Sequence, residues 1–380
     1  MKKLIFKKFS YDHALFFLYV ALSVSLIVWV IQAVNFLDIV SEDGHSFRIY
    51  FFYTLLNLPK IFSRILPFIF FISLFYIIIK YENFNELIIF WTIGIKKITF
   101  VNKTIKLSLF YVFIQLILTS YIVPNSQDAA RSFIRSSQLD FFPSLFKEKK
   151  FIDTVSGLTI FIEKKEKNGT FKNIFLKDQI KNNESQIIFA KSGTILNDQN
   201  NRAYLELYNG KFINNKGNKS TIFRFDKTKF NLSNYTTKTT TFPKIQEIPT
   251  KILFNCILTV DKIKFFEVDE KVFDQYFACN NKNSKNMKQE LFKRIILPFY
   301  LPLLSLIAAF VIIKSRDSYN YHKFQLLLLF IGIVIIIISE VSVRYTSINN
   351  ISVLLFFASI PIIFFTIFYC FLLNKLKFLK

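Results

Sequence analysis

The chain has 380 residues, of which 52% are hydrophobic and 18% aromatic, and its formal net charge is +23. This apolar and aromatic content exceeds that of ordinary soluble proteins of the same size. The sequence contains neither a GxxxxGK[ST] nor a GxGxxG motif, and its three His and three Cys form no spaced cluster of ligands. We therefore expect no nucleotide-binding loop, no metal site, no cofactor and no enzymatic activity of the chain itself.

The basic residues are spread between apolar runs, and most of them are Lys. Asn, Ile and Phe are also abundant, as AT-rich coding would produce. A nucleic-acid surface needs its charges gathered on one folded domain. We therefore interpret most of the positive charge as coding bias and expect no nucleic acid as a partner.

Six runs are long and apolar enough to cross a bilayer core of about 30 Å as helices. They cover residues 14–37, 50–79, 98–123, 291–313, 324–343 and 351–373. The first run could be a signal peptide, but it is long and its small residues lie inside it, which favours a retained anchor. The sequence thus predicts an α-helical membrane protein with three helices, a large insert and three more helices. The expected domains are residues 1–123, with a cytoplasmic segment at 80–97, then 124–289, then 290–380.

The Lys and Arg residues of the short loops predict the orientation, because such residues are retained on the cytoplasmic side. Thirteen of them lie in the two termini and in the loops at 80–97 and 314–323. The opposite short loops contain only Arg48 and Arg344. We therefore expect both termini in the cytoplasm and the large insert on the other side of the membrane.

The insert begins with short segments of alternating polarity, which are typical of half-buried strands. The expected strands cover residues 158–162, 171–176, 187–190, 203–208 and 221–232. The dipeptides Asn168-Gly169 and Asn209-Gly210 favour tight hairpin turns. We predict an antiparallel sandwich or open jelly roll over about 150–234. It would be either a plain structural module or a site for strand addition or acyl chains.

The rest of the insert is mixed in composition. Its runs 252–260 and 272–277 are expected to pack against the sandwich or near the membrane. Cys256 and Cys279 lie on the side where a disulfide is permitted, although their spacing fits two free thiols equally well. Glu290 and Arg294, four residues apart at the start of the fourth run, are expected to form a structural pair.

The loop at 80–97 contains an apolar stretch that starts with Glu86 and reaches Gly94, followed by two Lys. An acid at the start and Gly near the end are typical of a short helix. One interpretation is a helix that docks in the groove of a partner protein. The other is an interfacial helix on lipid headgroups, held by Trp91 and the two Lys. The pattern leaves both open.

Lys60 and Arg64 lie four residues apart in the second run and hence on one helical face. Two cations that face lipid tails would be costly. They therefore either face a cavity that binds anionic headgroups or phosphates, or extend toward the outer headgroups. Gln32 and Arg344 lie at the outer ends of the first and fifth runs. We treat these four residues as candidate contacts of a lipid headgroup.

Several local sequences, in this order, resemble those of one family. They are Leu58-Pro59, Ile65-Leu66-Pro67, and residues 86–94, 158–163, 171–176 and 290–294. With the three spans on either side of a jelly-roll insert, they resemble the YjgP/YjgQ family, which comprises the LptF and LptG permease subunits of the lipopolysaccharide exporter. The resemblance covers nearly the whole chain.

The resemblance implies a permease subunit that extracts lipopolysaccharide from the outer leaflet of a Gram-negative inner membrane. It also implies a paired LptF- or LptG-type subunit, an LptB-like ATPase dimer, and a periplasmic bridge of LptC- and LptA-type proteins. By this similarity, the segment with Glu86, Leu87, Trp91 and Gly94 would be the coupling helix on the ATPase. The first and fifth spans would line the gate for the lipid, and the jelly roll would pass it to the bridge.

The chain differs from the family at the outer end of the first span. Family members often carry basic residues there, whereas this chain has Gln32-Ala33-Val34-Asn35. Either the paired subunit supplies the charge, or Lys60, Arg64 and Arg344 do, and we favour the second. Two other functions are compatible with the pattern. One is a different ABC-type permease with a periplasmic domain, and the other is a membrane sensor or assembly factor whose sandwich binds a peptide or lipid.

Overall fold

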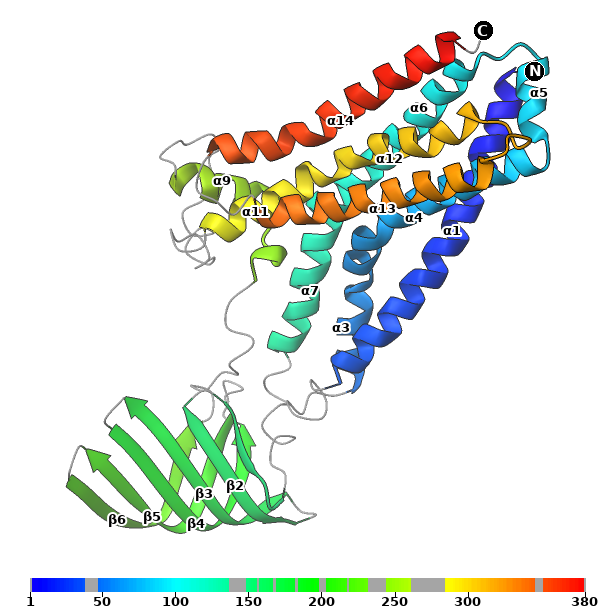
Figure 1. Cartoon of the computed structure of the whole chain (residues 1–380). Helices are drawn as coiled ribbons and strands as arrows, with labels where there is room; N and C mark the ends of the chain where they lie inside the picture. The colour runs from blue at the N-terminus through cyan, green and yellow to red at the C-terminus, as the bar shows by residue number, and fades with distance from the viewer. Residues whose placement is uncertain are drawn as a thin grey trace. The chain divides into compact units, whose positions relative to one another are not determined.

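The computed structural model describes residues 2–37, 47–136, 148–155, 157–166, 169–181, 184–197, 203–216, 219–231, 244–260, 284–345 and 351–378. They form a helical unit and a second unit that contains all the described strands (Figure 1). The helical unit comprises Met1–Val30, Asn57–Asp128 and Lys244–Lys380, and the second unit comprises Ile31–Leu56 and Ala129–Pro243. Each unit is thus built from segments that are distant in the chain.

Six helices of the described residues are long and apolar enough to span a membrane, as the sequence predicts. They cover Lys2–Asn35, Phe47–Asn83, Lys97–Ile134, Lys285–Ile313, Tyr321–Tyr345 and Phe356–Leu376. Most of them extend beyond the predicted apolar runs. The reason is that a helix continues into the polar residues at its ends until a residue that disfavours helix stops it.

Three of the spans are built from consecutive helices. The second joins α3 (Phe47–Leu56) and α4 (Leu58–Asn83), which separate at Asn57 because Pro59 occupies the first turn of α4. The third joins α6 (Lys97–Ile117), the π-helical turn η1 (Leu118–Ile122) and α7 (Val123–Ser136). The fourth joins α11 (Ser284–Ile295), η4 (Leu297–Phe299), α12 (Tyr300–Ala309) and η5 (Phe310–Ile313). The single-helix spans are α1 (Lys2–Asn35), α13 (Tyr321–Tyr345) and α14 (Ile351–Phe378).

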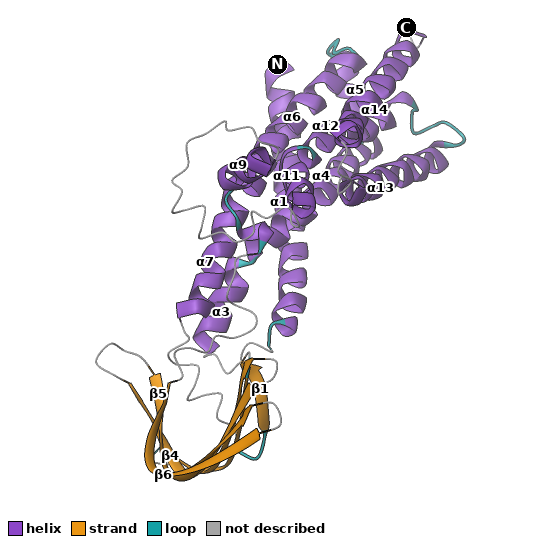
Figure 2. Ribbon diagram, turned by 90° about the vertical axis from the view of Figure 1, so that its left-hand side faces the viewer, coloured by secondary structure: helices purple, strands orange, loops and turns teal. Residues whose placement is uncertain are grey.

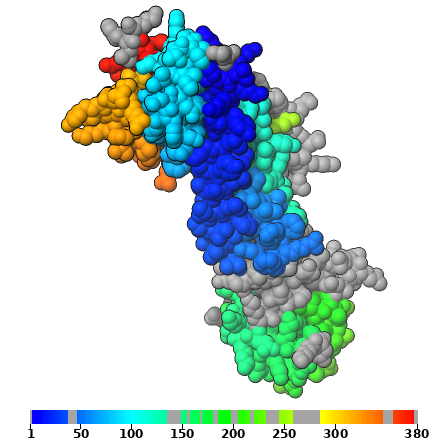
Figure 3. Space-filling model, turned by 90° about the vertical axis from the view of Figure 1, so that its right-hand side faces the viewer, coloured from blue at the N-terminus to red at the C-terminus, as the bar shows by residue number. Residues whose placement is uncertain are grey.

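The centre of the helical unit is formed by α4 and α12. Every residue of α12 is buried, and Phe70, Phe71 and Leu74 of α4 are completely inaccessible. By contrast, α1, α13 and α14 expose many large apolar side chains, and Figure 3 shows α1 (blue) along the surface of this unit. Such surfaces are expected of helices that face lipid or another membrane subunit.

The second unit contains one antiparallel sheet in which each strand pairs with the next, and the sheet is strongly curved (Figure 2). Its strands are β1 (Phe151–Val155), β2 (Leu158–Lys165), β3 (Thr170–Lys181), β4 (Glu184–Asn197), β5 (Ala203–Lys216) and β6 (Lys219–Asn231). A sandwich or jelly roll stacks two sheets, whereas the described strands form a single sheet with sequential order. The expected antiparallel insert is therefore present, but its jelly-roll topology is not confirmed.

One of the two predicted Asn-Gly turns is wrong. Asn209 and Gly210 lie in the middle of β5, where Asn209 has a φ of +50°. A Cβ at Gly210 would overlap the Phe189 carbonyl oxygen and the Phe225 ring, so close packing across the sheet accounts for this Gly. At the other dipeptide, Gly169 has a φ of +81° in the turn between β2 and β3, and Asn168 lies outside the described residues.

A short helix from the end of the insert packs against the start of the fourth span. α9 (Thr250–Val260) includes the predicted run 252–260, and its Leu253 and Cys256 form a buried cluster with Met287 of α11. The run 272–277 lies outside the described residues, as does Cys279. Cys256 is disulfide-bonded. α9 is thus attached to the start of the fourth span through apolar contacts.

Candidate functional site

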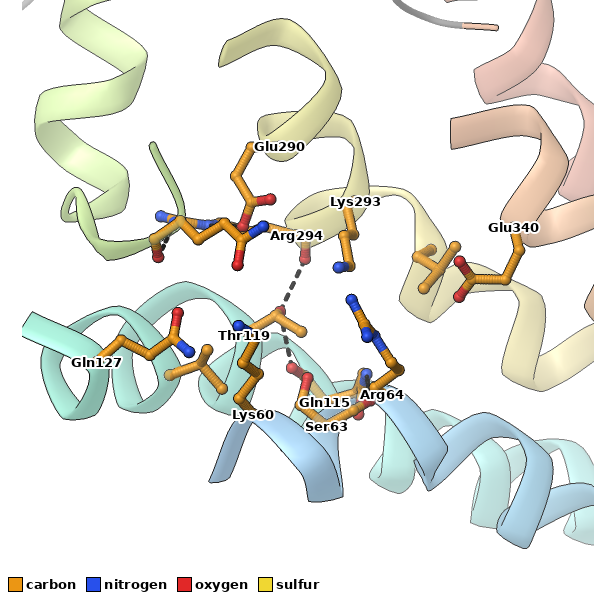
Figure 4. Close-up of a pocket in the computed structure, with 13 residues that line it drawn as sticks. Lys60, Ser63, Arg64, Gln115, Thr119, Gln127, Glu290, Lys293, Arg294 and Glu340 are labelled. Atoms are coloured by element: carbon orange, nitrogen blue, oxygen red, sulfur yellow. Dashed lines mark hydrogen bonds and ion pairs between the residues drawn. The ribbon is translucent and has the colours of Figure 1, made fainter. Parts of the chain in front are cut away.

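A polar pocket lies among the helices of the helical unit (Figure 4). Its cavity volume of about 30 Å³ accommodates one or two water molecules. It is lined by Lys60, Ser63 and Arg64 of α4, Gln115 of α6, Thr119 of η1, Val123 and Gln127 of α7, Gln246 of the 3-10 turn η2 (Ile245–Glu247), Glu290, Lys293 and Arg294 of α11, Leu297 of η4 and Glu340 of α13. Four cations and two carboxylates therefore meet in this pocket, together with five neutral polar side chains.

Lys60 and Arg64 both line this pocket, as their shared helical face allows. Neither of them forms an ion pair or a hydrogen bond with any described residue. Lys60 is half-buried, and it is repelled by the charges of Arg64, Lys293 and Lys244 and attracted by that of Glu247, whereas Arg64 is exposed. Clustered cations that repel one another bind an added anion more strongly than a single cation does.

Lys293 is a member of this cluster that the sequence analysis overlooked. It belongs to the last turn of α11, next to Arg294, and two basic residues at that position complement the partial negative charge of the helix end. Figure 4 shows its side chain extending toward the Arg64 guanidinium. The pair Lys293-Arg294 was the available signal, but only the fold places Lys293 beside Lys60 and Arg64.

Arg294 has a different role, because its guanidinium is fully engaged within the chain. Its Nε lies 3.2 Å from Glu290 Oε1, in the arrangement expected of the predicted pair. Its remaining nitrogens donate to the backbone oxygens of Ile248 at 2.8 Å and Gln246 at 3.0 Å, and to Thr250 Oγ1 at 2.9 Å. Arg294 thus connects α11 to the segment that leads into α9 and is not available to a ligand.

The wall opposite α11 is neutral and polar. Gln115 Nε2 donates to the Ser63 carbonyl oxygen at 2.8 Å, and Thr119 Oγ1 donates to the Arg294 carbonyl oxygen at 2.9 Å. Gln115 Oε1 is buried and has no partner among the described residues. A water molecule bound at this oxygen would satisfy it, which agrees with the size of the cavity.

The two other residues predicted to contact a headgroup do not line this pocket. Arg344 lies near the end of α13, one turn beyond Glu340, and only Glu340 faces the pocket. Within the described part of the chain, Glu340 and Arg344 do not form an ion pair, although their spacing permits one. Gln32 belongs to the second unit, so its position relative to Lys60 and Arg64 is not defined.

The predicted docking segment forms the short helix α5 (Glu86–Thr92). Glu86 forms an ion pair with Lys8 of α1, with 3.3 Å between Oε2 and Nζ, and the Gly94 carbonyl oxygen accepts from Lys2 Nζ at 3.4 Å. The starts of α1 and α5 and the end of α14 lie at the same end of the helical unit (Figure 1). The segment is therefore attached to the N-terminal turns of α1.

The apolar residues of α5 are divided between two faces. Leu87 and Phe90 are buried against the bundle, and Trp91 is half-buried beside the Phe100 ring. Ile88 and Ile89 are about half exposed, at 52% and 51%. The exposed apolar face of α5 is thus formed by Ile88 and Ile89, whereas the predicted docking residue Leu87 holds α5 in place.

The described residues contain no group of three or more His, Cys, Asp or Glu side chains that could hold a metal ion. The pocket carries unpaired positive charge. Lys60, Arg64 and Lys293 form no ion pair with any described residue, and all three line the same small polar space. Lys and Arg in such an arrangement bind phosphate or carboxylate groups. The arrangement is therefore chemically suited to binding an anion.

Comparisons with known proteins agree with this architecture. The uncharacterized protein RP871 of Rickettsia prowazekii (strain Madrid E) is 27% identical over 208 residues, which is 54% of this chain and 57% of that protein. The match therefore spans little more than half of the relative's length. A family model described as lipopolysaccharide export system permease LptF/LptG matches residues 12–375, nearly the whole chain. With its six membrane helices and inserted antiparallel sheet, the chain belongs to the LptF/LptG family of lipopolysaccharide export permeases.

Proposed function

We propose that the chain is one permease subunit of an ABC-type exporter, which takes lipopolysaccharide from the outer leaflet of the inner membrane and passes it to a periplasmic bridge. Family membership supports the transport of this lipid. In this proposal, three spans precede the sheet and three follow it, both termini are cytoplasmic, and the sheet is periplasmic. The asymmetry of Lys and Arg in the short loops supports this orientation.

The observation that carries the proposal is the cluster of Lys60, Arg64 and Lys293 in a pocket among membrane helices. Cations within a membrane protein are costly unless they serve a ligand or a counter-ion. Lipopolysaccharide presents phosphate groups on an apolar anchor, so its headgroup matches a cationic pocket next to lipid. We assign Lys60, Arg64 and Lys293 as phosphate contacts.

The double variant Lys60→Gln/Arg64→Gln is expected to bind lipopolysaccharide about tenfold more weakly, a loss of about 1.4 kcal/mol. Gln is polar and similar in size to the Lys and Arg side chains that it replaces, so the double variant removes only the two positive charges. The measurement is photocrosslinking of lipopolysaccharide to the assembled complex, with a photoreactive residue at position 63.

Lys106→Gln provides the matched control, because Lys106 is an exposed helix residue outside the pocket. Its crosslinking should equal that of the unmodified protein. Undiminished crosslinking in the double variant would refute the phosphate site. Weaker crosslinking in Arg344→Gln alone would place the site at the end of α13 instead.

For the energy source, we propose an LptB-like ATPase that docks on α5. Ile88 and Ile89 are exposed on α5, where Glu86 pairs with Lys8 and the Lys97 ammonium lies over the Trp91 ring. An apolar contact rimmed by charge is a common way for a short helix to enter a partner's groove. The paired LptF- or LptG-type subunit and the LptC- and LptA-type bridge complete the proposed complex.

The variant Ile88→Ser/Ile89→Ser is expected to lower the amount of ATPase that co-purifies in detergent by about tenfold, because two apolar anchors are lost from a small contact. Leu326→Ser serves as control, because it likewise removes an exposed apolar side chain, but from α13 and not from α5. Full retention of the ATPase by the double variant would argue against α5 as the docking site. A chain that never co-purifies with an ATPase would instead be a membrane sensor or assembly factor.

A further inference from the structure

Glu340 of α13 is the one carboxylate in the pocket without an ion pair among the described residues. Glu290, the other carboxylate, is bound to Arg294. Figure 4 shows Glu340 on the side of the pocket opposite Gln127, and Leu297 and Arg64 line the same pocket. Its charge therefore lowers the positive potential around Lys60, Arg64 and Lys293, and Glu247 has the same effect at Lys60.

The position of Glu340 is fixed by contacts that do not involve its own side chain. Gln289 of α11, one turn before Lys293, donates from Nε2 to the Val343 carbonyl oxygen at 3.0 Å. The neighbouring hydroxyls of Ser339 and Ser342 donate to oxygens of their own helix. The end of α13 is thus held beside α11 by the bond from Gln289. The Glu340 side chain adds a negative charge to the pocket and takes no part in holding the helix there.

The geometry points to Glu340 as an internal competitor of the anionic ligand: its carboxylate partly neutralises Lys60, Arg64 and Lys293 when the site is empty, and a bound phosphate replaces it. The inference rests on the proposed function, since it assumes that this pocket binds a phosphate group. A bound anion also repels the Glu340 carboxylate. Because Glu340 lies on α13 and the cations lie on α4 and α11, this repulsion pushes α13 away from those two helices. A carboxylate in this place keeps the site from binding its ligand too tightly for release.

Removal of this charge is expected to strengthen binding. Glu340→Gln should bind lipopolysaccharide about threefold to fivefold more tightly, as expected for the loss of one exposed charge interaction. Glu340→Asp keeps the charge and should resemble the unmodified protein. The gain should be smaller in the Arg64→Gln background, because one of the three cations that the carboxylate offsets is then absent. The measurement is the titration of fluorescent lipopolysaccharide against the whole complex in detergent at two salt concentrations.

The outcomes separate this inference from the proposed function. If Lys60→Gln/Arg64→Gln weakens binding while Glu340→Gln leaves it unchanged or weaker, the competitor role is wrong and the phosphate site stands. If neither variant changes binding, the phosphate site itself is wrong. Inorganic phosphate is included as a second probe, and its displacement of the lipid at equal concentration would identify a site for free phosphate and overturn both. Equal thermal midpoints of all variants exclude a folding defect.

Discussion

Replacing Arg294 with Ala is expected to lower the free energy of unfolding by about 3 to 5 kcal/mol, because removal of one partner of a buried ion pair leaves the other charge uncompensated. The Arg294 side chain is only 2% exposed and also satisfies the carbonyl oxygens of Ile248 and Gln246. Its loss separates α11 from the segment that leads into α9. The measurement is the thermal unfolding midpoint of the detergent-solubilised protein, which should fall markedly.

Lys293 provides the control for this variant, since it is the next residue of the same helix. Lys293→Ala should change the unfolding free energy by no more than about 0.5 kcal/mol, because no described residue pairs with its side chain. Lys293→Ala should instead weaken the binding of lipopolysaccharide. Arg294→Lys should keep part of the stability, because it retains the positive charge next to Glu290. Equal losses of stability in Lys293→Ala and Arg294→Ala would contradict this division between a ligand contact and a structural residue.

Gly332→Val is expected to destabilise the helical unit by about 1 to 3 kcal/mol, the usual cost of overpacking a tightly packed core. Gly332 lies on α13, and a Cβ at this position would overlap the ring of Phe71 on α4. Phe71 is completely buried, so its ring has no free space to enter. The unfolding midpoint of the purified protein tests this expectation, together with the accessibility of α13 to proteolysis.

A second substitution shows whether the Phe71 ring is the cause. In Gly332→Val/Phe71→Ala the ring that would clash is absent, so the double variant should be more stable than the sum of the two single losses predicts. Simple additivity would mean that Gly332 is needed for another reason. Because α13 carries Glu340, a displaced α13 should also alter the binding of lipopolysaccharide.

Lys293 and Arg294 illustrate why charge alone does not assign a role. The two residues are adjacent, basic and in the last turn of α11. One side chain is surrounded by carbonyl oxygens and a carboxylate, and the other enters a space lined by further cations. The first arrangement stabilises the fold and the second attracts an anion. The difference lies in their partners, which come from residues far away in the chain.

Much of the architecture follows from local sequence pattern. Apolar runs of the length of a bilayer predict the six helices, because the hydrophobic effect acts on each run separately. Alternating polarity predicts strands such as 158–162 and 203–208, because side chains of a strand alternate between faces. The turn expected at Asn209-Gly210 was wrong, since the same dipeptide also suits a strand interior where a neighbouring strand approaches closely.

Local pattern was sufficient to predict the membrane helices, the pairing of Glu290 with Arg294 and the face shared by Lys60 and Arg64. It also predicted most strands of the insert, but neither β1 nor the continuation of β5 beyond Asn209. All of these depend on residues that are close in the chain. The packing of the helices brings Lys293 and Glu340 into one pocket with Lys60 and Arg64. It also buries Leu87 of α5 and leaves Ile88 and Ile89 exposed. The pocket contacts join segments more than two hundred residues apart, and the orientation of the α5 side chains depends on how this helix packs against its neighbours. Neither can be predicted from a local sequence pattern.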